Sequence, residues 1–299
     1  MEISTVLIYL KDLLATVMTL LMMLSPAFPA QGVPYTAENP DELIASFAVV
    51  SDIHVETNNP DSYINLKNVL EGIKAGENLD AVVYTGDNVM NGQALENLFF
   101  YTAVRGVMPA KENYVIAGNH DFGNGEGDYS QFRRNFILNN NLYFGSNITE
   151  PYYYKVLNGC YMIVLASEDL SVNDYVMSDK QLEWLEGVLE EAEAADAPIF
   201  VFNHHPVYLI RDRDSGELAR ILQKYDNLLY VHGHYHNDLD AENFYQWDNI
   251  DCINLPRITE TTEYEPGDGI VVEVYEDEVV VRGRDFIKGE WIDGLRYTY

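Results

Sequence analysis

The stretch Ser46-Phe47-Ala48-Val49-Val50-Ser51-Asp52-Ile53-His54 decides how this chain folds. Its first part, Ser46 to Val50, is short, apolar and rich in valine, so it predicts a buried β-strand. Asp52 and His54 follow that strand directly, two residues apart. At this spacing a carboxylate and an imidazole point to the same side of an extended segment. The strand is therefore expected to present two metal-competent side chains at its carboxyl end.

The same arrangement, a short apolar run followed by polar side chains, recurs along the chain. Further strands are expected at Ala81 to Thr85, Tyr114 to Ala117, Tyr161 to Ala166, Ile199 to Phe202 and Leu228 to Val231. Four of these five lead into residues that can bind metal, which are Asp87, Asn119 with His120, His204, and His234 with His236. Because strand carboxyl ends in an open α/β sheet line one crevice, these distant residues are expected to converge.

Segments between and after these strands complete an α/β pattern. Helices are expected at Tyr63 to Gly76, Ala94 to Val107 and Ser178 to Ala195, with Ser178 as the N-cap of the third. From Asp251 onward the pattern changes to β. There, Ile270 to Tyr275 and Val279 to Arg284 flank a short acidic turn and predict a hairpin. This late β section is expected to add strands to the same domain.

The amino terminus has the order of a secretory signal. Leu13 to Leu24 is a run of apolar or hydroxyl residues, preceded by Lys11 and followed by a small-residue, proline-broken stretch. Because a membrane span needs about 20 apolar residues, export with cleavage near Ala27 or Ala30 is favoured over a permanent anchor. The expected division of the chain is a signal peptide or N-terminal membrane anchor at 1–30, a linker at 31–40 and one domain at 41–299. The protein is then expected to be secreted or to lie at the cell surface.

Composition limits the partners of this chain. Its 299 residues, 47% of them apolar, are enough to bury a substantial core. With 48 acidic and 18 basic residues the formal charge is -30, which repels nucleic acid and anionic membrane surfaces. A small phosphorylated substrate is still compatible, because local metal charge can outweigh a distant acidic surface.

The two cysteines, Cys160 and Cys252, lie far apart in apolar runs. Buried free thiols and a single disulfide both fit this placement. The redox compartment is therefore left open by the cysteines.

The residue types at the strand ends suit two divalent ions. The two-residue spacing of Asp52 and His54 recurs in His234 and His236, so each pair can direct its side chains toward one ion. Asp87 has two carboxylate oxygens and can bridge paired ions that also share a hydroxide nucleophile. Nitrogen and oxygen ligands without thiolate are compatible with manganese, iron, zinc or cobalt.

Five sequence blocks resemble those of the calcineurin-like metallophosphoesterases. In chain order they are Asp52-Ile53-His54, Gly86-Asp87-Asn88, Gly118-Asn119-His120-Asp121, His204-His205-Pro206 and Gly233-His234-Tyr235-His236. Each block alone is weak, but five in family order, each after a strand candidate, are specific. The resemblance implies a double β-sandwich flanked by helices, a four-layer αββα fold. It also implies a metal-dependent hydrolase of phosphate esters.

The same resemblance assigns roles to individual residues. One ion is assigned to Asp52, His54, Asp87 and His236, and the other to Asp87, Asn119, His204 and His234. His120 is the implied catalytic residue, a general acid that faces the substrate together with Asn119. His204 is taken as the ligand because the family ligand stands two positions before the proline, which leaves His205 either to support a ligand or to serve the structure. Asp121 is expected to orient a histidine.

One departure from the family narrows the function. Protein serine/threonine phosphatases of this family have an aspartate and an arginine where this chain has Met90 and Asn91. The resemblance therefore favours a phosphodiesterase or phosphomonoesterase acting on small phosphorylated molecules. Two alternatives are a nuclease of the same family, which the charge disfavours, and a non-catalytic metal-containing surface binding protein, which the complete ligand set disfavours. No protein partner is inferred.

Overall fold

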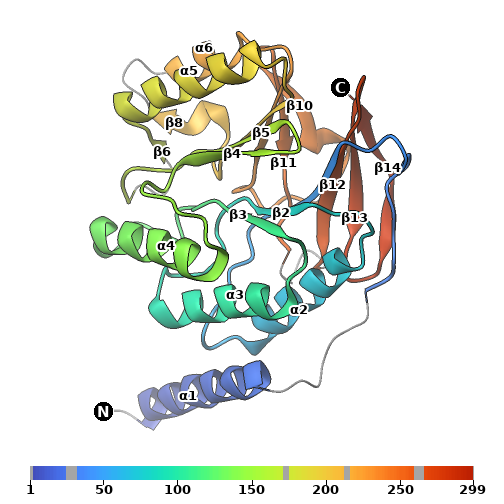
Figure 1. Ribbon diagram of the computed structural model, residues 1–299. Helices are drawn as coiled ribbons and strands as arrows, with labels where there is room; N and C mark the ends of the chain where they lie inside the picture. The colour runs from blue at the N-terminus through green and yellow to red at the C-terminus, as the bar shows by residue number, and fades with distance from the viewer. Residues whose placement is uncertain (1–2, 25–31, 171–174, 212–215, 259–265, 299) are drawn as a thin grey trace.

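The computed structural model describes residues 3–24, 32–170, 175–211, 216–258 and 266–298. Two six-stranded sheets form its centre (Figure 1). The first has the order β14-β13-β12-β1-β2-β3 and consists of β1 (Ala45–Val50), β2 (Ala81–Tyr84), β3 (Glu112–Val115), β12 (Asp268–Val274), β13 (Val279–Asp285) and β14 (Glu290–Thr298). Strands β1 to β3 are parallel, and β12 pairs antiparallel with both β1 and β13. The predicted hairpin is therefore confirmed, and its strands extend the sheet that begins with β1.

The second sheet has the order β10-β11-β9-β7-β5-β4. Its strands are β4 (Tyr153–Leu157), β5 (Cys160–Val164), β7 (Ile199–Phe202), β9 (Leu228–His232), β10 (Phe244–Trp247) and β11 (Ile250–Asn254). The four central strands are parallel, and the two edge strands pair antiparallel. Cys160 on β5 and Cys252 on β11 are both buried and free, because β7 and β9 lie between their strands. A separate parallel pair joins β6 (Tyr175–Val176) to β8 (Ile210–Arg211).

The two sheets pack face to face through apolar side chains. Phe47 of β1 meets Phe200 and Phe202 of β7 edge-on, with ring centroids 5.0 and 6.1 Å apart. All three rings are fully buried. Aromatic rings in this edge-on arrangement combine large apolar burial with favourable quadrupole contacts. This interface is the centre of the double β-sandwich.

Helices cover the outer faces of both sheets (Figure 1). The first sheet is covered by α2 (Pro60–Lys74) and α3 (Ala94–Val107), with α4 (Tyr129–Phe144) beside α3, and the second by α5 (Asp179–Ala194) and α6 (Glu217–Leu222). Two short 3-10 helices, η1 (Val207–Leu209) and η2 (Ala241–Asn243), lie in loops of the second half. The observed layers are helix, sheet, sheet and helix, so the predicted four-layer αββα fold is confirmed.

The helix α5 has the N-cap and the buried apolar face that its local sequence encodes. Ser178 is its N-cap, and the Ser178 hydroxyl accepts a hydrogen bond from the Gln181 amide at 3.3 Å. This bond satisfies one of the amide groups that lack a partner at a helix start. Leu182, Leu185 and Leu189 are buried at helical spacing against the second sheet. The cap agrees with the sequence-based prediction.

The amino-terminal helix α1 (Ile3–Leu24) lies alongside α2 (Figure 1). None of the helices in the described residues has the length and apolar content needed to cross a membrane. The expected cleavage positions Ala27 and Ala30 lie outside the described residues. Within the segment expected to be a linker, the Tyr35 hydroxyl donates to the Ile73 carbonyl at 3.2 Å, and the Arg284 guanidinium stacks 4.0 Å from the Tyr35 ring.

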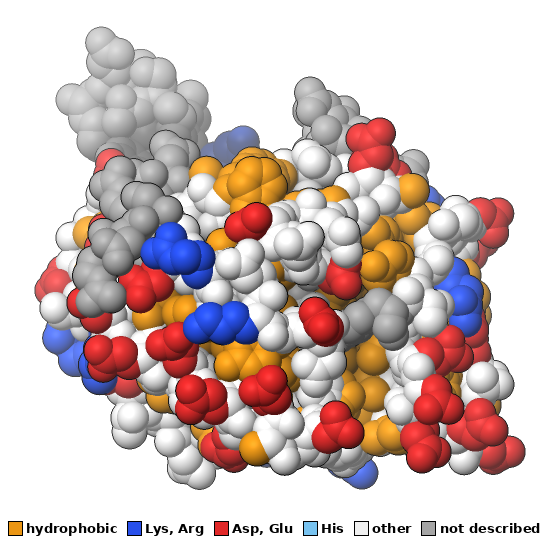
Figure 2. Space-filling view, turned by 90° about the horizontal axis from the view of Figure 1, so that it is seen from above, with side chains coloured by type: hydrophobic (Ala, Val, Ile, Leu, Met, Phe, Trp, Pro, Cys, Tyr) orange, Lys and Arg blue, Asp and Glu red, His pale blue; other side chains and the backbone are white. Residues whose placement is uncertain are grey.

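The acidic composition is visible on the surface. In the face drawn in Figure 2, aspartate and glutamate side chains are spread among neutral and apolar ones, while lysines and arginines are sparse. On the described residues of this face, no basic stripe of the kind that nucleic-acid binding normally requires is seen.

Candidate metal centre

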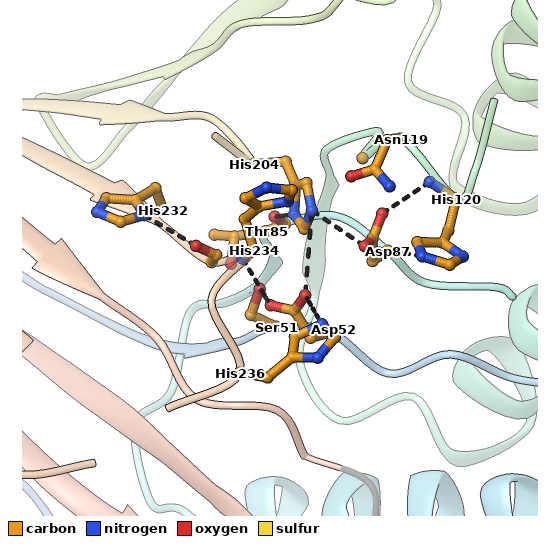
Figure 3. Close-up of polar contacts among 12 residues, drawn as sticks. Ser51, Asp52, Thr85, Asp87, Asn119, His120, His204, His232, His234 and His236 are labelled. Carbon is orange, nitrogen blue, oxygen red and sulfur yellow. Dashed lines mark hydrogen bonds and ion pairs between the residues drawn. The ribbon is translucent and has the colours of Figure 1, made fainter. Parts of the chain in front are cut away.

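The loops that follow β1, β2, β3, β7 and β9 meet at one place between the two sheets (Figure 3). One group there consists of Asp52, His54, Asp87 and His236, whose potential ligand atoms all lie within 4.8 Å of one another. The His54 and His236 Nε2 atoms are 3.1 Å apart, and His236 Nε2 lies 2.9 Å from Asp52 Oδ1. These four residues are the ones assigned above to a single ion, and they come from three separate segments of the chain.

A second group lies on the other side of Asp87. His204, His205 and His234 have potential ligand atoms within 4.8 Å of one another. His204 Nε2 is 3.1 Å from Asp87 Oδ2, while His54 Nε2 approaches the same oxygen at 3.7 Å from the first group. Asp87 is therefore placed between the two groups, as a bridging carboxylate needs to be. His205, which the sequence left outside the ligand set, belongs to this second group by distance.

Most of the predicted ligands have strained backbone conformations. Five of the seven predicted ligands have positive φ angles, namely Asp52 (53°), His54 (49°), Asp87 (50°), His234 (80°) and His236 (57°). A non-glycine residue in this region costs about 1 kcal/mol or more. Strain of this kind persists where the surrounding structure fixes it, and it clusters at functional sites. The turns after these strands are thus shaped to aim side chains inward at the expense of local stability.

Two motif glycines allow the loops to approach so closely. A Cβ at Gly118 would lie 2.1 Å from Asp87 Oδ1, and a Cβ at Gly233 would lie 2.3 Å from Asp52 Oδ2. Both distances are far below any real carbon contact, and the neighbours are the carboxylates of the site itself. Glycine at these positions is therefore a geometric requirement of bringing the five segments together.

The buried polar atoms of the cluster fit divalent metal ions. Among the described residues, Asn119 Oδ1 is buried and forms no hydrogen bond, while the polar atoms closest to Asp52 Oδ1 and His204 Nε2 belong to other proposed ligands. Asn119 uses its amide nitrogen to donate to Asn124 Oδ1 at 3.0 Å, which leaves its oxygen directed into the site. Buried polar atoms without partners are costly. Nitrogen and oxygen atoms converging in this way are the donors that manganese, iron and zinc accept.

A sequence model of the family described as calcineurin-like phosphoesterase matches residues 45–238, which is more than half of the chain. The chain belongs to the calcineurin-like phosphoesterase family. The predicted family membership is therefore confirmed. A search of curated proteins finds no match to this phosphoesterase.

Solved structures agree with this assignment at the level of the fold. A dimetal phosphatase from Danio rerio aligns with a TM-score of 0.60 and 17% identity over 86% of this chain and 98% of its own. A purple acid phosphatase from yellow lupin (Lupinus luteus) seeds aligns with a TM-score of 0.57 and 13% identity over 85% of this chain and 53% of its own. At such identities the likeness shows a shared fold.

Histidines in the proposed metal centre of the phosphoesterase keep the neighbouring aspartates ionised. Burial alone would raise the pKa of Asp52 and of Asp87, but the neighbouring His204 and further histidines hold both well below the ordinary aspartate range. For His204, burial alone would lower the pKa, because it disfavours the charged imidazole. The negative charges of Asp87 and Asp52 outweigh this effect and raise the pKa of His204 to about 9. The metal-free centre therefore carries a proton on His204 at neutral pH.

The proton on His204 leads us to expect that metal affinity depends on pH. Metal binding requires neutral imidazole, so an ion entering the metal-free centre must displace the His204 proton below pH of about 9. The apparent affinity for Mn²⁺ or Zn²⁺ should rise with pH up to that value. Titration calorimetry of the metal-free protein in two buffers of different ionisation enthalpy should show buffer-dependent heats. Heats that do not depend on the buffer would contradict the assignment.

His120 lies at the rim of the centre, with its side chain 19% exposed. Its Nδ1 is 2.6 Å from the Met90 carbonyl oxygen, and its backbone amide donates to Asp87 Oδ1 at 2.9 Å. A carbonyl can only accept, so Nδ1 carries the proton and Nε2 is the atom left to act on a substrate. The backbone carbonyl of Met90 thus holds the His120 ring in place. Met90 stands where protein phosphatases of the family have an aspartate.

Asp121 has a different role from the expected one, since its hydrogen bonds within the described residues go to backbone and side-chain amides and not to a histidine. Its Oδ2 accepts from the Gly118 amide at 2.8 Å and from the Asn88 backbone and side-chain nitrogens at 3.2 Å. Burial, with the nearby charge of Asp87, raises the pKa of Asp121 to about 7. The expectation that Asp121 orients a histidine is therefore wrong: this carboxyl ties the second and third motif loops together.

Arg257 is a residue near the centre that the sequence analysis missed. It follows β11 and forms a parallel bridge with Ser51, and the next amide, of Ile258, donates to the Ser51 carbonyl at 3.3 Å. Burial lowers the pKa of Arg257, while the charges of Asp52 and Asp87 oppose that shift. This places a cation beside the first metal-ligand loop. A single arginine after an apolar run has no motif around it, so no local signal could have identified it.

Proposed function

We propose that this chain hydrolyses phosphate esters of small molecules at a dinuclear metal centre. The observation that carries the proposal is the convergence of Asp52, His54, Asp87 and His236 within 4.8 Å. The description of one structural neighbour as a dimetal phosphatase supports the same chemistry. Two divalent ions, manganese, iron or zinc, bound there would polarise phosphoryl oxygens and lower the pKa of water to provide a hydroxide nucleophile.

The residues of the chain divide the remaining work. Asp52, His54, Asp87 and His236 would hold one ion, and Asp87, Asn119, His204 and His234 the other. Asn119 and His120 also face the position of a bound phosphate. His120 presents Nε2 to the leaving oxygen and, when protonated, transfers its proton there as the ester bond breaks. Arg257 would balance the negative charge of the phosphate.

The direct test is ester hydrolysis by metal-stripped protein with and without added Mn²⁺. Bis-p-nitrophenyl phosphate and p-nitrophenyl phosphate report diesterase and monoesterase activity separately. Turnover of at least one ester that appears only with the metal is expected. A protein that binds two ions and hydrolyses neither ester would contradict the proposal.

Replacing Arg257 by methionine should raise KM and lower kcat/KM about 10- to 100-fold, because the variant loses one or two charge-assisted hydrogen bonds to phosphate. Methionine keeps a similar length while removing the charge. The matched control is Arg105→Met, because Arg105 is exposed in the last turn of α3, where its guanidinium contacts the Met108 sulfur. Equal kinetics of the Arg257 variant and the control would remove Arg257 from the phosphate site.

We also propose that residues 1–30 direct export of the protein and that cleavage near Ala27 or Ala30 releases the mature enzyme. The support is the apolar run Leu13 to Leu24 followed by small residues and prolines. Amino-terminal sequencing of protein recovered outside the cell tests this directly. A mature chain that still begins at Met1 would contradict the cleavage.

A further inference from the structure

A cavity of about 460 Å³ lies next to the proposed metal centre. It is lined in part by Tyr235, which stands in the chain between the proposed ligands His234 and His236. The Tyr235 and His234 rings have centroids 5.6 Å apart. His232, which Figure 3 places to one side of the ligand cluster, forms another part of the wall. The cavity therefore adjoins the loop that carries two of the proposed metal ligands.

Aromatic rings make up one side of the cavity. Tyr208 and Tyr235 lie nearly parallel, with ring centroids 6.3 Å apart and 20° between their planes. Tyr208 and Tyr235 are 41% and 40% exposed, whereas aromatic residues are usually more buried because of their large apolar area. Tyr245 completes this side, and its hydroxyl lies 2.6 Å from His232 Nε2. Partly exposed tyrosine rings in a concave site can attract cations, because the face of an aromatic ring is negative.

The polar side of the cavity accepts hydrogen bonds and carries negative charge. Asp238 and Glu242 line it, and both are exposed. No lysine or arginine is among its lining residues in the part of the chain that the structure describes. A phosphate or carboxylate would be repelled here, whereas a cation would be attracted.

A buried acceptor in the cavity wall lacks a hydrogen-bond donor. Asn254, at the end of β11, is 5% exposed and lines the cavity. Its side-chain oxygen has no hydrogen-bond partner among the described residues. Its backbone carbonyl accepts from the side-chain Nδ2 of Asn243 at 2.7 Å, which fixes the adjacent wall. A buried carbonyl oxygen of this kind needs an N–H or O–H donor.

We propose, building on the phosphoesterase function above, that this cavity binds a protonated amine in the alcohol part of the substrate. A primary ammonium group meets all three features, since it carries positive charge, donates three hydrogen bonds and packs against ring faces. A quaternary ammonium group has the charge without donors. A neutral polyol has donors without the charge. The substrate class is therefore a phosphate ester of an amino alcohol.

Three p-nitrophenyl diesters separate these possibilities on the full, metal-loaded protein. Their second alcohol is 2-aminoethyl, propyl or choline, so the propyl ester replaces the ammonium by a methyl group. We expect kcat/KM for the aminoethyl ester to exceed that for the propyl ester about tenfold or more, the worth of charge-assisted hydrogen bonds. The choline ester should lie between them. Equal values for aminoethyl and propyl esters, or a higher value for the choline ester, would overturn the proposal.

A charge-matched pair of double variants locates the effect. The variant Asp238→Asn with Glu242→Gln should reduce the aminoethyl-to-propyl ratio toward one. The control, Asp277→Asn with Glu276→Gln, makes the same charge change in the turn between β12 and β13 and should leave the ratio unaltered. An equal drop in both variants would assign the preference to overall charge and overturn the cavity assignment. Metal content measured in both variants checks that the centre is intact.

Binding keeps this proposal separate from the proposed function. Calorimetric titration of metal-loaded protein with O-phosphoethanolamine and with propyl phosphate reports the preference without turnover. If bis-p-nitrophenyl phosphate is hydrolysed but neither assay favours the amine, the amine site is wrong and the phosphoesterase function stands. If no ester is hydrolysed, the proposed function is wrong, and the amine site is then tested by binding alone. Tighter binding of O-phosphoethanolamine than of propyl phosphate would support the amine site, and equal or weaker binding would overturn it.

Discussion

Replacing Asp87 by asparagine should abolish measurable turnover together with the binding of at least one metal ion. Asp87 Oδ2 lies 3.1 Å from His204 Nε2 and 3.7 Å from His54 Nε2, between the two ligand groups. Asparagine offers one neutral oxygen in place of two anionic ones, so it cannot bridge two cations. Even residues that only support a metal ligand cost 10- to 100-fold in affinity when changed, so we expect a loss of more than about 100-fold.

Metal content by elemental analysis and hydrolysis of bis-p-nitrophenyl phosphate should be measured on the same preparations. The matched control is Asp41→Asn, which makes the same chemical change at an exposed position outside the site. It should keep both ions and full activity. An Asp87→Asn protein that retained two ions and normal turnover would falsify the dinuclear assignment.

The local fold was predictable because apolar periodicity is a local property of the chain. The strand Ile199–Phe202 and the helix Ala94–Val107 have the bounds expected from the sequence. The exposed edge strand β10 (Phe244–Trp247) and the largely exposed β14 (Glu290–Thr298) were not predicted, since strands facing solvent lack a continuous apolar run. Which strands share a sheet also depends on long-range pairing that no local window contains.

The site was predictable to the extent that its residues follow strands. The two-residue spacing of Asp52 and His54 predicted their shared direction, and the structure brings both into one group with His236. The convergence differs in one respect from an open sheet, because the contributing strands belong to two facing sheets. Contacts made by backbone atoms, such as the Met90 carbonyl with His120, have no residue-type signal at all. The same applies to Arg257, whose position depends on β11 lying where it does.

Replacing His120 by glutamine should lower kcat while leaving metal content unchanged. The side chain contributes no atom to either ligand group of the described residues, and its Nδ1 is held by the Met90 carbonyl at 2.6 Å. Loss of a general acid typically reduces the rate about 100- to 10,000-fold. Glutamine keeps hydrogen-bonding capacity and similar length but cannot deliver a proton. Elemental analysis beside steady-state kinetics on an alkyl phosphate ester would measure both quantities.

The identity of the leaving group distinguishes a proton donor from a residue that only shapes the site. An alkoxide leaving group needs its proton as the ester bond breaks, whereas p-nitrophenolate is stable without one. The His120→Gln variant should therefore lose far more activity on a methyl ester than on the corresponding p-nitrophenyl ester. Equal losses on both esters with unchanged metal content would show that His120 only positions the phosphate. Because Nδ1 is already occupied by a carbonyl, Nε2 is the atom on which the proton reaching the leaving group must be carried.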